Sequence, residues 1–239
     1  MHAPPAPPRP RRFIAIAGNI GVGKSTMLEF LCTRYGFTPF EEPDRLNPYL
    51  SDFYADMERW AFHSQVSFLT HKFRAHRELQ RSTGTVVQDR TIYEDAEIFA
   101  RNLFDQKLMT ERDWRTYWDL YQGMRESLQP PDLMIYLTCS TTAMRRRIKT
   151  RGRPAEQDIP PSYLQRLQRL YEEWISRYDQ SPLLVWQTDR MNYLTDLVHR
   201  LDFTRALQPF VEDPVTVRQA APTSRPLGGN AARPPGDSD

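Results

Sequence analysis

The stretch that decides the fold of this 239-residue chain is Gly18-Asn19-Ile20-Gly21-Val22-Gly23-Lys24-Ser25. It matches the pattern G-x-x-x-x-G-K-[ST] in full, and it lies between an apolar run, Phe13–Ala17, and a stretch with helical periodicity. Glycines let the backbone turn tightly and aim N–H groups at phosphate oxygens, while the following helix N-terminus adds a positive field. The stretch therefore predicts a P-loop that binds a nucleotide.

Three side chains of this stretch carry the chemistry of phosphate binding. Lys24 is expected to reach the β and γ oxygens of ATP, Ser25 to hold Mg²⁺, and Thr26 to add a further hydroxyl to the cradle. The alternative is a glycine-rich turn with a surface lysine, which leaves the agreement of both flanking elements unexplained. The motif does not identify the phosphate acceptor.

Short apolar runs alternate with helical periodicity on either side of the P-loop. This order is typical of βαβ units in an α/β fold with a parallel sheet. The expected strands are Phe13–Ala17, Phe37–Phe40, Thr85–Gln88, Leu133–Thr138 and Leu183–Trp186. The expected helices are Ser25–Tyr35, Glu58–Gln80, Asp95–Phe104, Glu111–Leu128, Thr141–Thr150, Ser162–Tyr178 and Tyr193–Ala206.

Half of the 20 prolines lie in the two ends of the chain, which predicts disorder over residues 1–10 and 212–239. One domain is expected between them, over residues 11–211.

Composition narrows the class of partner and the compartment. With 32 Lys+Arg against 30 Asp+Glu, the totals do not favour a nucleic acid or a membrane surface as partner. Cys32 and Cys139 are too few for a disulfide framework and lack metal-ligand spacing. The apolar run Phe13–Ala17 is too short for a signal peptide or a membrane span. We therefore expect a cytoplasmic protein that binds small molecules.

Four further motifs follow the P-loop in a fixed order. They are Glu42-Pro43, Tyr54 with Glu58–Gln65, Asp89–Asp95 and Arg147–Gln157. In this order they resemble the family of deoxycytidine, deoxyguanosine and deoxyadenosine kinases, and are most similar to its bacterial purine-type members, over roughly Arg12 to Leu207. The resemblance implies a P-loop kinase fold with an arginine-rich lid, and transfer of the γ-phosphoryl group of ATP to the 5′-hydroxyl of a deoxynucleoside in nucleotide salvage.

The resemblance implies that Glu42 is the general base for the 5′-hydroxyl. A carboxylate at the C-terminal end of a strand faces the crevice where α/β folds bind ligands. Glu41 is the alternative base, because adjacent strand residues point to opposite faces. Two solvated carboxylates are a weaker alternative, since Pro43 fixes the turn.

A glutamine and a lysine on the expected helix Glu58–Gln80 are the residues expected to contact the nucleobase. The resemblance implies that the amide of Gln65 reads a base edge. Lys72 lies about 10 Å further along nearly the same helical face and is expected to read the far side of the base. Family members carry Arg at this place, and Lys cannot form a bidentate fork, so Arg74 is the alternative.

The remaining nucleoside contacts are also implied by the resemblance. Asp95 is expected to shape base selection and Phe99 to stack on the base, with core packing as the alternative for Phe99. Tyr54 and Glu156 match residues that hold the sugar 3′-hydroxyl. Without the family, Tyr54 is better described as a surface tyrosine.

Asp89 and Arg90 end the third expected strand. They are expected to act as a Walker-B-like carboxylate for Mg²⁺ and as a cation beside the reacting phosphate. The family usually carries Glu-Arg here, so the shorter Asp89 is expected to reach Mg²⁺ through water.

Arg147, Arg151 and Arg153 form a basic cluster whose alternative interpretation is a solvated face. The sequel Glu156-Gln157 completes the resemblance to the family lid, which closes over ATP. Closure would place Arg151 and Arg153 on the migrating phosphoryl group, with Arg147 beside the nucleotide, and would exclude water.

The pattern around the base predicts purine deoxynucleosides as substrates. A guanine edge offers acceptors at O6 and N7 to Lys72, and Asp95 can accept from an N–H group. Asn47-Pro48 stands where a tryptophan would indicate the animal enzymes. Family members are commonly dimers, and two of the expected helices have apolar faces, so a homodimer is expected by analogy.

Two other functions stay open. A nucleoside-monophosphate kinase of thymidylate type shares the P-loop, the Asp-Arg pair and the lid, but Glu42 and Gln65 favour a neutral hydroxyl as acceptor. A catalytically silent family member that serves as a binding subunit should have lost a catalytic residue, and this chain retains all of them. A regulatory GTPase or a motor is disfavoured, because the chain lacks an N-K-x-D motif and a long insertion.

Overall fold

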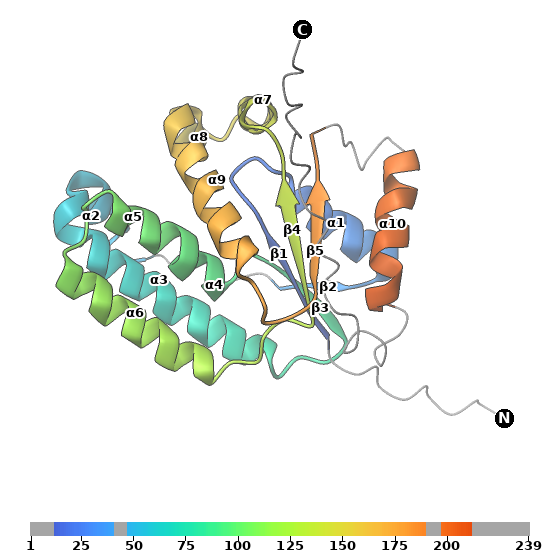
Figure 1. Cartoon of the computed structure of the whole chain (residues 1–239), viewed down its shortest axis with the longest axis horizontal. Helices are drawn as coiled ribbons and strands as arrows, with labels where there is room; N and C mark the ends of the chain where they lie inside the picture. Colours follow the sequence, from blue (N-terminus) through green and yellow to red (C-terminus); the bar gives the residue numbers. More distant parts are fainter. Residues whose placement is uncertain (1–11, 41–46, 190–196, 212–239) are drawn as a thin grey trace, which may run out of the picture.

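The computed structural model describes residues 12–40, 47–189 and 197–211. Its centre is a five-stranded parallel sheet in the order β2-β3-β1-β4-β5 (Figure 1). The strands are β1 (Arg12–Ala17), β2 (Thr38–Pro39), β3 (Thr85–Asp89), β4 (Leu133–Thr138) and β5 (Leu183–Gln187). The predicted α/β class with a five-stranded parallel sheet is confirmed.

The central strand β1 explains why the apolar run precedes the glycine loop. Its residues from Phe13 to Ala17 are buried, because both faces of a parallel sheet are covered. Ile14 pairs with Val87 of β3 on one side, and Ile16 pairs with Ile135 of β4 on the other. The chain therefore enters the P-loop from the middle of the sheet, at its carboxyl edge.

Helices cover both faces of the sheet. Figure 1 shows α1 and α10 beside one face and α3, α6 and α9 beside the other. The helices are α1 (Lys24–Tyr35), α2 (Leu50–Ala55), α3 (Met57–Leu79), α4 (Ile92–Glu94), the π-helix η1 (Asp95–Ala100), α5 (Arg101–Asp105), α6 (Glu111–Glu126), α7 (Thr141–Arg151), α8 (Pro154–Gln157), α9 (Pro161–Ser176) and α10 (Leu197–Val211).

Two large apolar clusters pack against the sheet. The first joins it to α3, α6 and α9, and its side chains include Leu69, Tyr121 and Trp174. The second joins it to α1, α7 and α10, with Met27 and Phe203 among its buried members. The carboxyl end of β1, where the P-loop begins, therefore lies between two packed layers.

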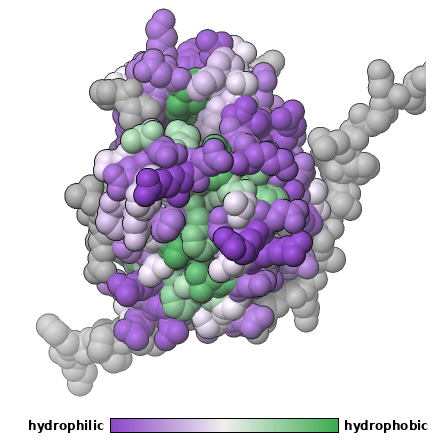
Figure 2. All heavy atoms as spheres, turned by 90° about the vertical axis from the view of Figure 1, so that its left-hand side faces the viewer, coloured by the Kyte–Doolittle hydropathy of each residue, from purple (hydrophilic) through white to green (hydrophobic). Residues whose placement is uncertain are grey.

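A third apolar cluster lies at the end of the helical layer, where α2 meets α3 and α5. Seen from the left-hand side of Figure 1, this end of the molecule carries a vertical band of apolar side chains flanked by polar ones (Figure 2). Within the described part of the chain, no helix is both long enough and apolar enough to cross a bilayer.

Several predicted elements differ from the observed ones. The predicted helix Asp95–Phe104 begins earlier, at Ile92, and contains the π-helical segment η1. The short helices α2 and α8 were not predicted, because four to six residues show too little periodicity. The predicted helix Tyr193–Ala206 is observed over Leu197–Val211, and residues 190–196 lie outside the described ranges.

Candidate active site

The P-loop runs so close to its neighbours that two of its glycines have no room for a side chain. Gly18 has φ +145°, and a Cβ there would lie 2.5 Å from the carbonyl oxygen of Leu137 in β4. Gly21 has φ +78°, and its Cβ would lie 2.8 Å from the carbonyl oxygen of Met144 in α7. Left-handed backbone and close contact both require glycine here. The loop is thus fixed against β4 and α7.

Lys24, at the start of α1, turns its ammonium group back into the loop. Its Nζ donates to the carbonyl oxygens of Gly18 at 2.7 Å and Asn19 at 3.1 Å. Burial lowers the pKa of Lys24 to about 8, against the opposing effect of Asp89, whose Oδ1 lies 4.0 Å from Nζ. The ammonium group is partly desolvated and is held by two backbone carbonyl groups. In this position it can bind phosphate oxygens.

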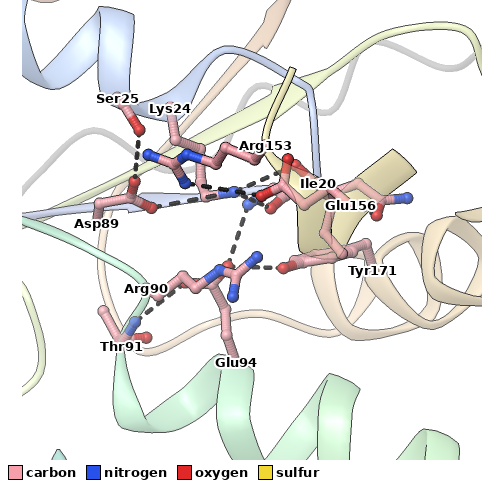
Figure 3. A network of polar contacts seen from close by, with 12 residues as sticks. Ile20, Lys24, Ser25, Asp89, Arg90, Thr91, Glu94, Arg153, Glu156 and Tyr171 are labelled. Atoms are coloured by element: carbon pink, nitrogen blue, oxygen red, sulfur yellow. Dashed lines mark hydrogen bonds and ion pairs between the residues drawn. The ribbon is translucent and has the colours of Figure 1, made fainter. Parts of the chain in front are cut away.

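Ser25 and Asp89 form the candidate magnesium site (Figure 3). The hydroxyl of Ser25 donates to Asp89 Oδ2 at 3.4 Å. The other carboxylate oxygen, Oδ1, is buried and accepts no hydrogen bond from any described residue. The described residues hold no group of three His, Cys, Asp or Glu side chains that would bind a metal by themselves. A hydroxyl and a carboxylate fit Mg²⁺, which keeps several waters and binds phosphate oxygens as well.

Arg90 follows Asp89 at the carboxyl end of β3, in an unusual backbone conformation. Its φ of +64° lies in the left-handed region, where a residue other than glycine is strained. The ammonium group of Lys72 donates to its carbonyl oxygen at 2.8 Å. Its guanidinium group lies 4.9 Å from the centre of the Phe99 ring. Two residues predicted for the nucleoside therefore contact the residue predicted for the phosphate.

The predicted base-reading residues lie on two neighbouring segments, α3 and η1. Gln65 and Lys72 of α3 are buried, as is Asp95 at the start of η1, and Phe99 is half-buried. The amide of Gln65 makes no hydrogen bond within the described part of the chain, although the side chain is only 6% exposed. Segments of π-helix are rare and recur at functional sites. The segment that carries Asp95 and Phe99 is of this kind.

Among the predicted nucleoside contacts that the structure describes, Tyr54 is the one that lies on the surface. Its side chain on α2 is 68% exposed and packs against the ring of Phe53, at 5.4 Å between centroids. This is the surface position described by the alternative interpretation of Tyr54.

The lid residues pair with one another. The guanidinium group of Arg151 donates to a carboxylate oxygen of Glu156, and Arg153 lies 3.6 Å from the other oxygen. Gly152 ends α7 with a φ of +68° and so lets the chain turn between the two arginines. Arg151 is close enough to Lys24 to lower the pKa of that lysine further. Glu156 thus contacts the lid arginines in this structure, and it is the residue predicted for the sugar.

Arg147 connects the P-loop to the end of β5. Its guanidinium group donates to the carbonyl oxygen of Val22 and to the hydroxyl of Thr188, both at 2.9 Å, and to the Thr188 carbonyl. Thr188 also donates to Val22, at 2.8 Å. The sequence predicts that Arg147 contacts the nucleotide. In the structure its guanidinium group contacts the backbone of the P-loop, which is the loop expected to bind the nucleotide.

Glu94 is a buried residue of this region for which the sequence predicts no role. Its carboxylate accepts hydrogen bonds from the backbone of Gly18 and Thr91 and from the hydroxyl of Tyr171 (Figure 3). The spacing of Thr91 and Glu94 is that of a helix capping box, a signal that predicts the helix start but not the other two contacts. The predicted base Glu42, and its alternative Glu41, lie outside the described residues.

Known proteins resemble this chain over most of its length. A family model described as deoxynucleoside kinase matches residues 14–212. Deoxyadenosine/deoxycytidine kinase of Bacillus subtilis is 40% identical over 186 residues, which cover 77% of this chain and 85% of that protein. Deoxyguanosine kinase of Lactobacillus acidophilus is 36% identical over 196 residues, covering 78% of this chain and 85% of the relative.

Solved structures show the same similarity. A deoxyadenosine kinase from M. mycoides with bound dATP matches this structure with a TM-score of 0.68 and 31% identity, covering 81% of this chain and 99% of the other. The same kinase with bound dCTP matches with a TM-score of 0.67 at 29% identity, with the same coverage.

Proposed function

The chain belongs to the deoxynucleoside kinase family, and from this premise we propose that it transfers the γ-phosphoryl group of ATP to the 5′-hydroxyl of purine deoxynucleosides. The observation that carries the proposal is the meeting of two sets of residues at one edge of the sheet. Lys24, Ser25 and Asp89, which lie close together, are the residues proposed for phosphate and magnesium. Arg90 joins that site to Lys72 and Phe99 on the nucleoside side.

The phosphate half of the site supplies positive charge where the transferred group passes. Backbone N–H groups of the P-loop and the ammonium group of Lys24 bind the β and γ oxygens. Mg²⁺ held by Ser25 and Asp89 would neutralise charge on the same oxygens. Arg90, with the lid arginines Arg151 and Arg153, adds planar donors for the charge that develops during transfer.

The reaction itself is a single displacement. Glu42 accepts the proton of the 5′-hydroxyl as that oxygen forms a bond to the γ-phosphorus, and the bond to the β–γ bridging oxygen breaks. ADP leaves with the electron pair of the broken bond, and the product is a deoxynucleoside 5′-monophosphate. Glu42 is proposed for this role from its motif, since its side chain lies outside the described residues.

The purine preference is supported by the residues that surround the base site. The amide of Gln65, which has no hydrogen-bond partner among the described residues, can both donate to a base edge and accept from it. Asp95 adds an acceptor, and Phe99 adds a half-buried aromatic face. Relatives named for deoxyguanosine and deoxyadenosine favour the same preference, while the Bacillus subtilis relative, named also for deoxycytidine, makes deoxycytidine the decisive competitor.

The experiment is a phosphorylation panel over deoxyguanosine, deoxyadenosine, deoxycytidine and thymidine at matched concentrations, with ATP and Mg²⁺, and with dTMP as a further acceptor. We expect the highest kcat/KM for a purine deoxynucleoside. A pyrimidine in first place refutes the purine preference. Turnover of dTMP without turnover of nucleosides indicates a nucleotide kinase, and no turnover at all indicates a silent family member.

A homodimer and a cytosolic location complete the proposal. Met57 on α3 and Leu120 on α6 are each 39% exposed, large apolar side chains on helices whose surfaces a second copy would cover. Light scattering of the wild type and of Leu120→Glu tests the homodimer, with a monomeric wild type as the contrary result.

Both cysteines, Cys32 and Cys139, form no disulfide, which is compatible with the proposed reducing compartment.

A further inference from the structure

Glu94 is fully buried at the junction of α4 and η1, and it receives hydrogen bonds from three separate parts of the fold. Its Oε1 accepts from the backbone N–H of Gly18 at 3.2 Å and from the hydroxyl of Tyr171 at 2.8 Å. Its Oε2 accepts from the backbone N–H of Thr91 at 3.1 Å. Figure 3 shows the Glu94 side chain below Lys24 and Asp89 and beside Arg90, with a dashed line to Tyr171.

Both carboxyl oxygens of Glu94 act as acceptors. Three groups donate to them, two backbone N–H groups and one hydroxyl, which is an arrangement that an acidic side chain can satisfy. Burial raises the pKa of Glu94, and the charge of Lys24 and the hydrogen bond from Tyr171 oppose that rise. A buried charge is costly unless it is paired and hydrogen-bonded. The surroundings supply three hydrogen bonds to the Glu94 side chain, which hold it in a fixed position.

The three donors belong to parts of the protein with different tasks. Gly18 is the first residue of the P-loop. Thr91 caps the helical segment that continues into η1, which carries Asp95 and Phe99, two residues proposed for the nucleoside. Tyr171 lies on α9, the long helix that follows the lid. The carboxylate of Glu94 is therefore hydrogen-bonded to the P-loop, to the segment that leads into η1, and to the helix α9 that follows the lid.

We propose that Glu94 is a positioning residue that fixes the P-loop relative to the nucleoside-binding segment, acting through Gly18 and Tyr171 without touching either substrate. The proposal rests on the proposed function. Phosphoryl transfer needs the 5′-oxygen in line with the γ-phosphorus, and a misplacement of about 1 Å can cost on the order of 10²-fold in rate. Each substrate keeps its own contacts when Glu94 is changed, so the loss should appear in kcat and not in KM.

The test compares Glu94→Gln with a matched variant, Glu97→Gln. Glu97 is also a buried glutamate of this segment, but its carboxylate pairs with Arg177, at 2.7 Å, and not with the P-loop. In Glu94→Gln the amide nitrogen faces one of three donors and breaks the bridge. We expect kcat to fall by about 30-fold to 100-fold with both KM values within about threefold of wild type. Glu97→Gln should keep kcat within about threefold.

Tyr171→Phe provides a second, milder test, because it removes one donor and keeps the ring. We expect a fall in kcat of about threefold to tenfold, and a double variant no slower than Glu94→Gln alone, since both changes break one bridge. If Glu94→Gln does not fold, Tyr171→Phe decides by the same division between kcat and KM. Melting temperatures are measured for every variant.

Three results would overturn the proposal. One is a Glu94→Gln enzyme with wild-type kcat and a lower melting temperature, which would make the residue merely structural. Another is a rise in KM for ATP that accounts for the whole loss. The last is an equal loss in Glu97→Gln. Failure of the proposed function is distinct, because it shows as a wild-type enzyme that phosphorylates no deoxynucleoside.

Discussion

The ammonium group of Lys72 lies 2.8 Å from the backbone carbonyl oxygen of Arg90, the residue that follows β3 and has a left-handed backbone conformation. A residue other than glycine keeps such a conformation only where its surroundings hold it there. Lys72 thus has a task in this structure besides the base reading that its position on α3 predicts. Support for Arg90 and selection of the base can be separated by substitution.

Lys72→Met removes the donor and keeps much of the side-chain volume. We expect kcat/KM for deoxyguanosine to fall by about tenfold to 100-fold, with kcat also reduced because Arg90 loses its support. Lys72→Arg restores a cation and should recover more activity than Lys72→Met. The ratio of kcat/KM for deoxyguanosine to that for deoxyadenosine reports base selection. Arg74→Met, on the exposed face of α3, is the control.

The opposite pattern would move base reading to another residue. If Lys72→Met keeps the wild-type ratio while Arg74→Met changes it, the alternative raised by the sequence is correct. If neither changes the ratio, selection lies with Gln65 and Asp95.

The sequence predicts the parts of the site that depend on neighbours along the chain. The P-loop is one contiguous run, and Asp89 and Arg90 follow a strand whose end could be placed within one residue. The sequence predicts that Ser25 and Asp89 both serve Mg²⁺. The structure places these two side chains in contact at the carboxyl edge of the sheet.

The contacts that the sequence does not predict join residues far apart in the chain. Glu94 accepts from Gly18, which precedes it by 76 residues, and Arg147 donates to Val22 across 125 residues. The sequence shows that these charged side chains are present. Their directions are determined by the packing of α7, α9 and the sheet. The π-helical segment is also missed, because the sequence predicts only one regular helix over Asp95–Phe104.

Glu42→Gln keeps the shape of the side chain but cannot accept the proton of the 5′-hydroxyl. We expect deoxynucleoside binding to persist while kcat falls by about 10²-fold or more. Binding is measured by calorimetry and kcat by formation of the monophosphate. Glu41→Gln is the matched control, and the base is the neighbouring residue if that variant loses turnover while Glu42→Gln does not.

Glu156→Gln tests whether the lid carboxylate that pairs with Arg151 also binds the sugar. If it accepts a hydrogen bond from the 3′-hydroxyl, the variant should lose about tenfold in kcat/KM with deoxyguanosine and much less with 2′,3′-dideoxyguanosine, which has no 3′-hydroxyl. Equal losses with both nucleosides would show that Glu156 acts only on the lid arginines. Kinetics with the two nucleosides at matched concentrations decide the matter.

Deletion of residues 214–239 should leave kcat and the melting temperature nearly unchanged. This tail is rich in proline, glycine and arginine and offers little apolar area for packing. The control is Leu207→Ala in α10, a fully buried side chain whose truncation should cost about 2–5 kcal/mol of stability. Thermal unfolding compares the two, and a drop of several degrees in the deletion variant would show that the tail packs on the domain.

Lys24→Ala should separate ATP binding from phosphoryl transfer. The ammonium group lies within the P-loop, bonded to the carbonyl oxygens of Gly18 and Asn19, beside the oxygens that gain charge as the γ-phosphoryl group moves. It therefore stabilises the transition state more than bound ATP, so kcat should fall by about 10³-fold and ATP affinity by about tenfold or less. Rapid-quench turnover and calorimetry measure the two quantities. Lys107→Gln, an exposed lysine after α5, should leave both unchanged, and a Lys24→Ala enzyme with wild-type turnover would refute the P-loop assignment.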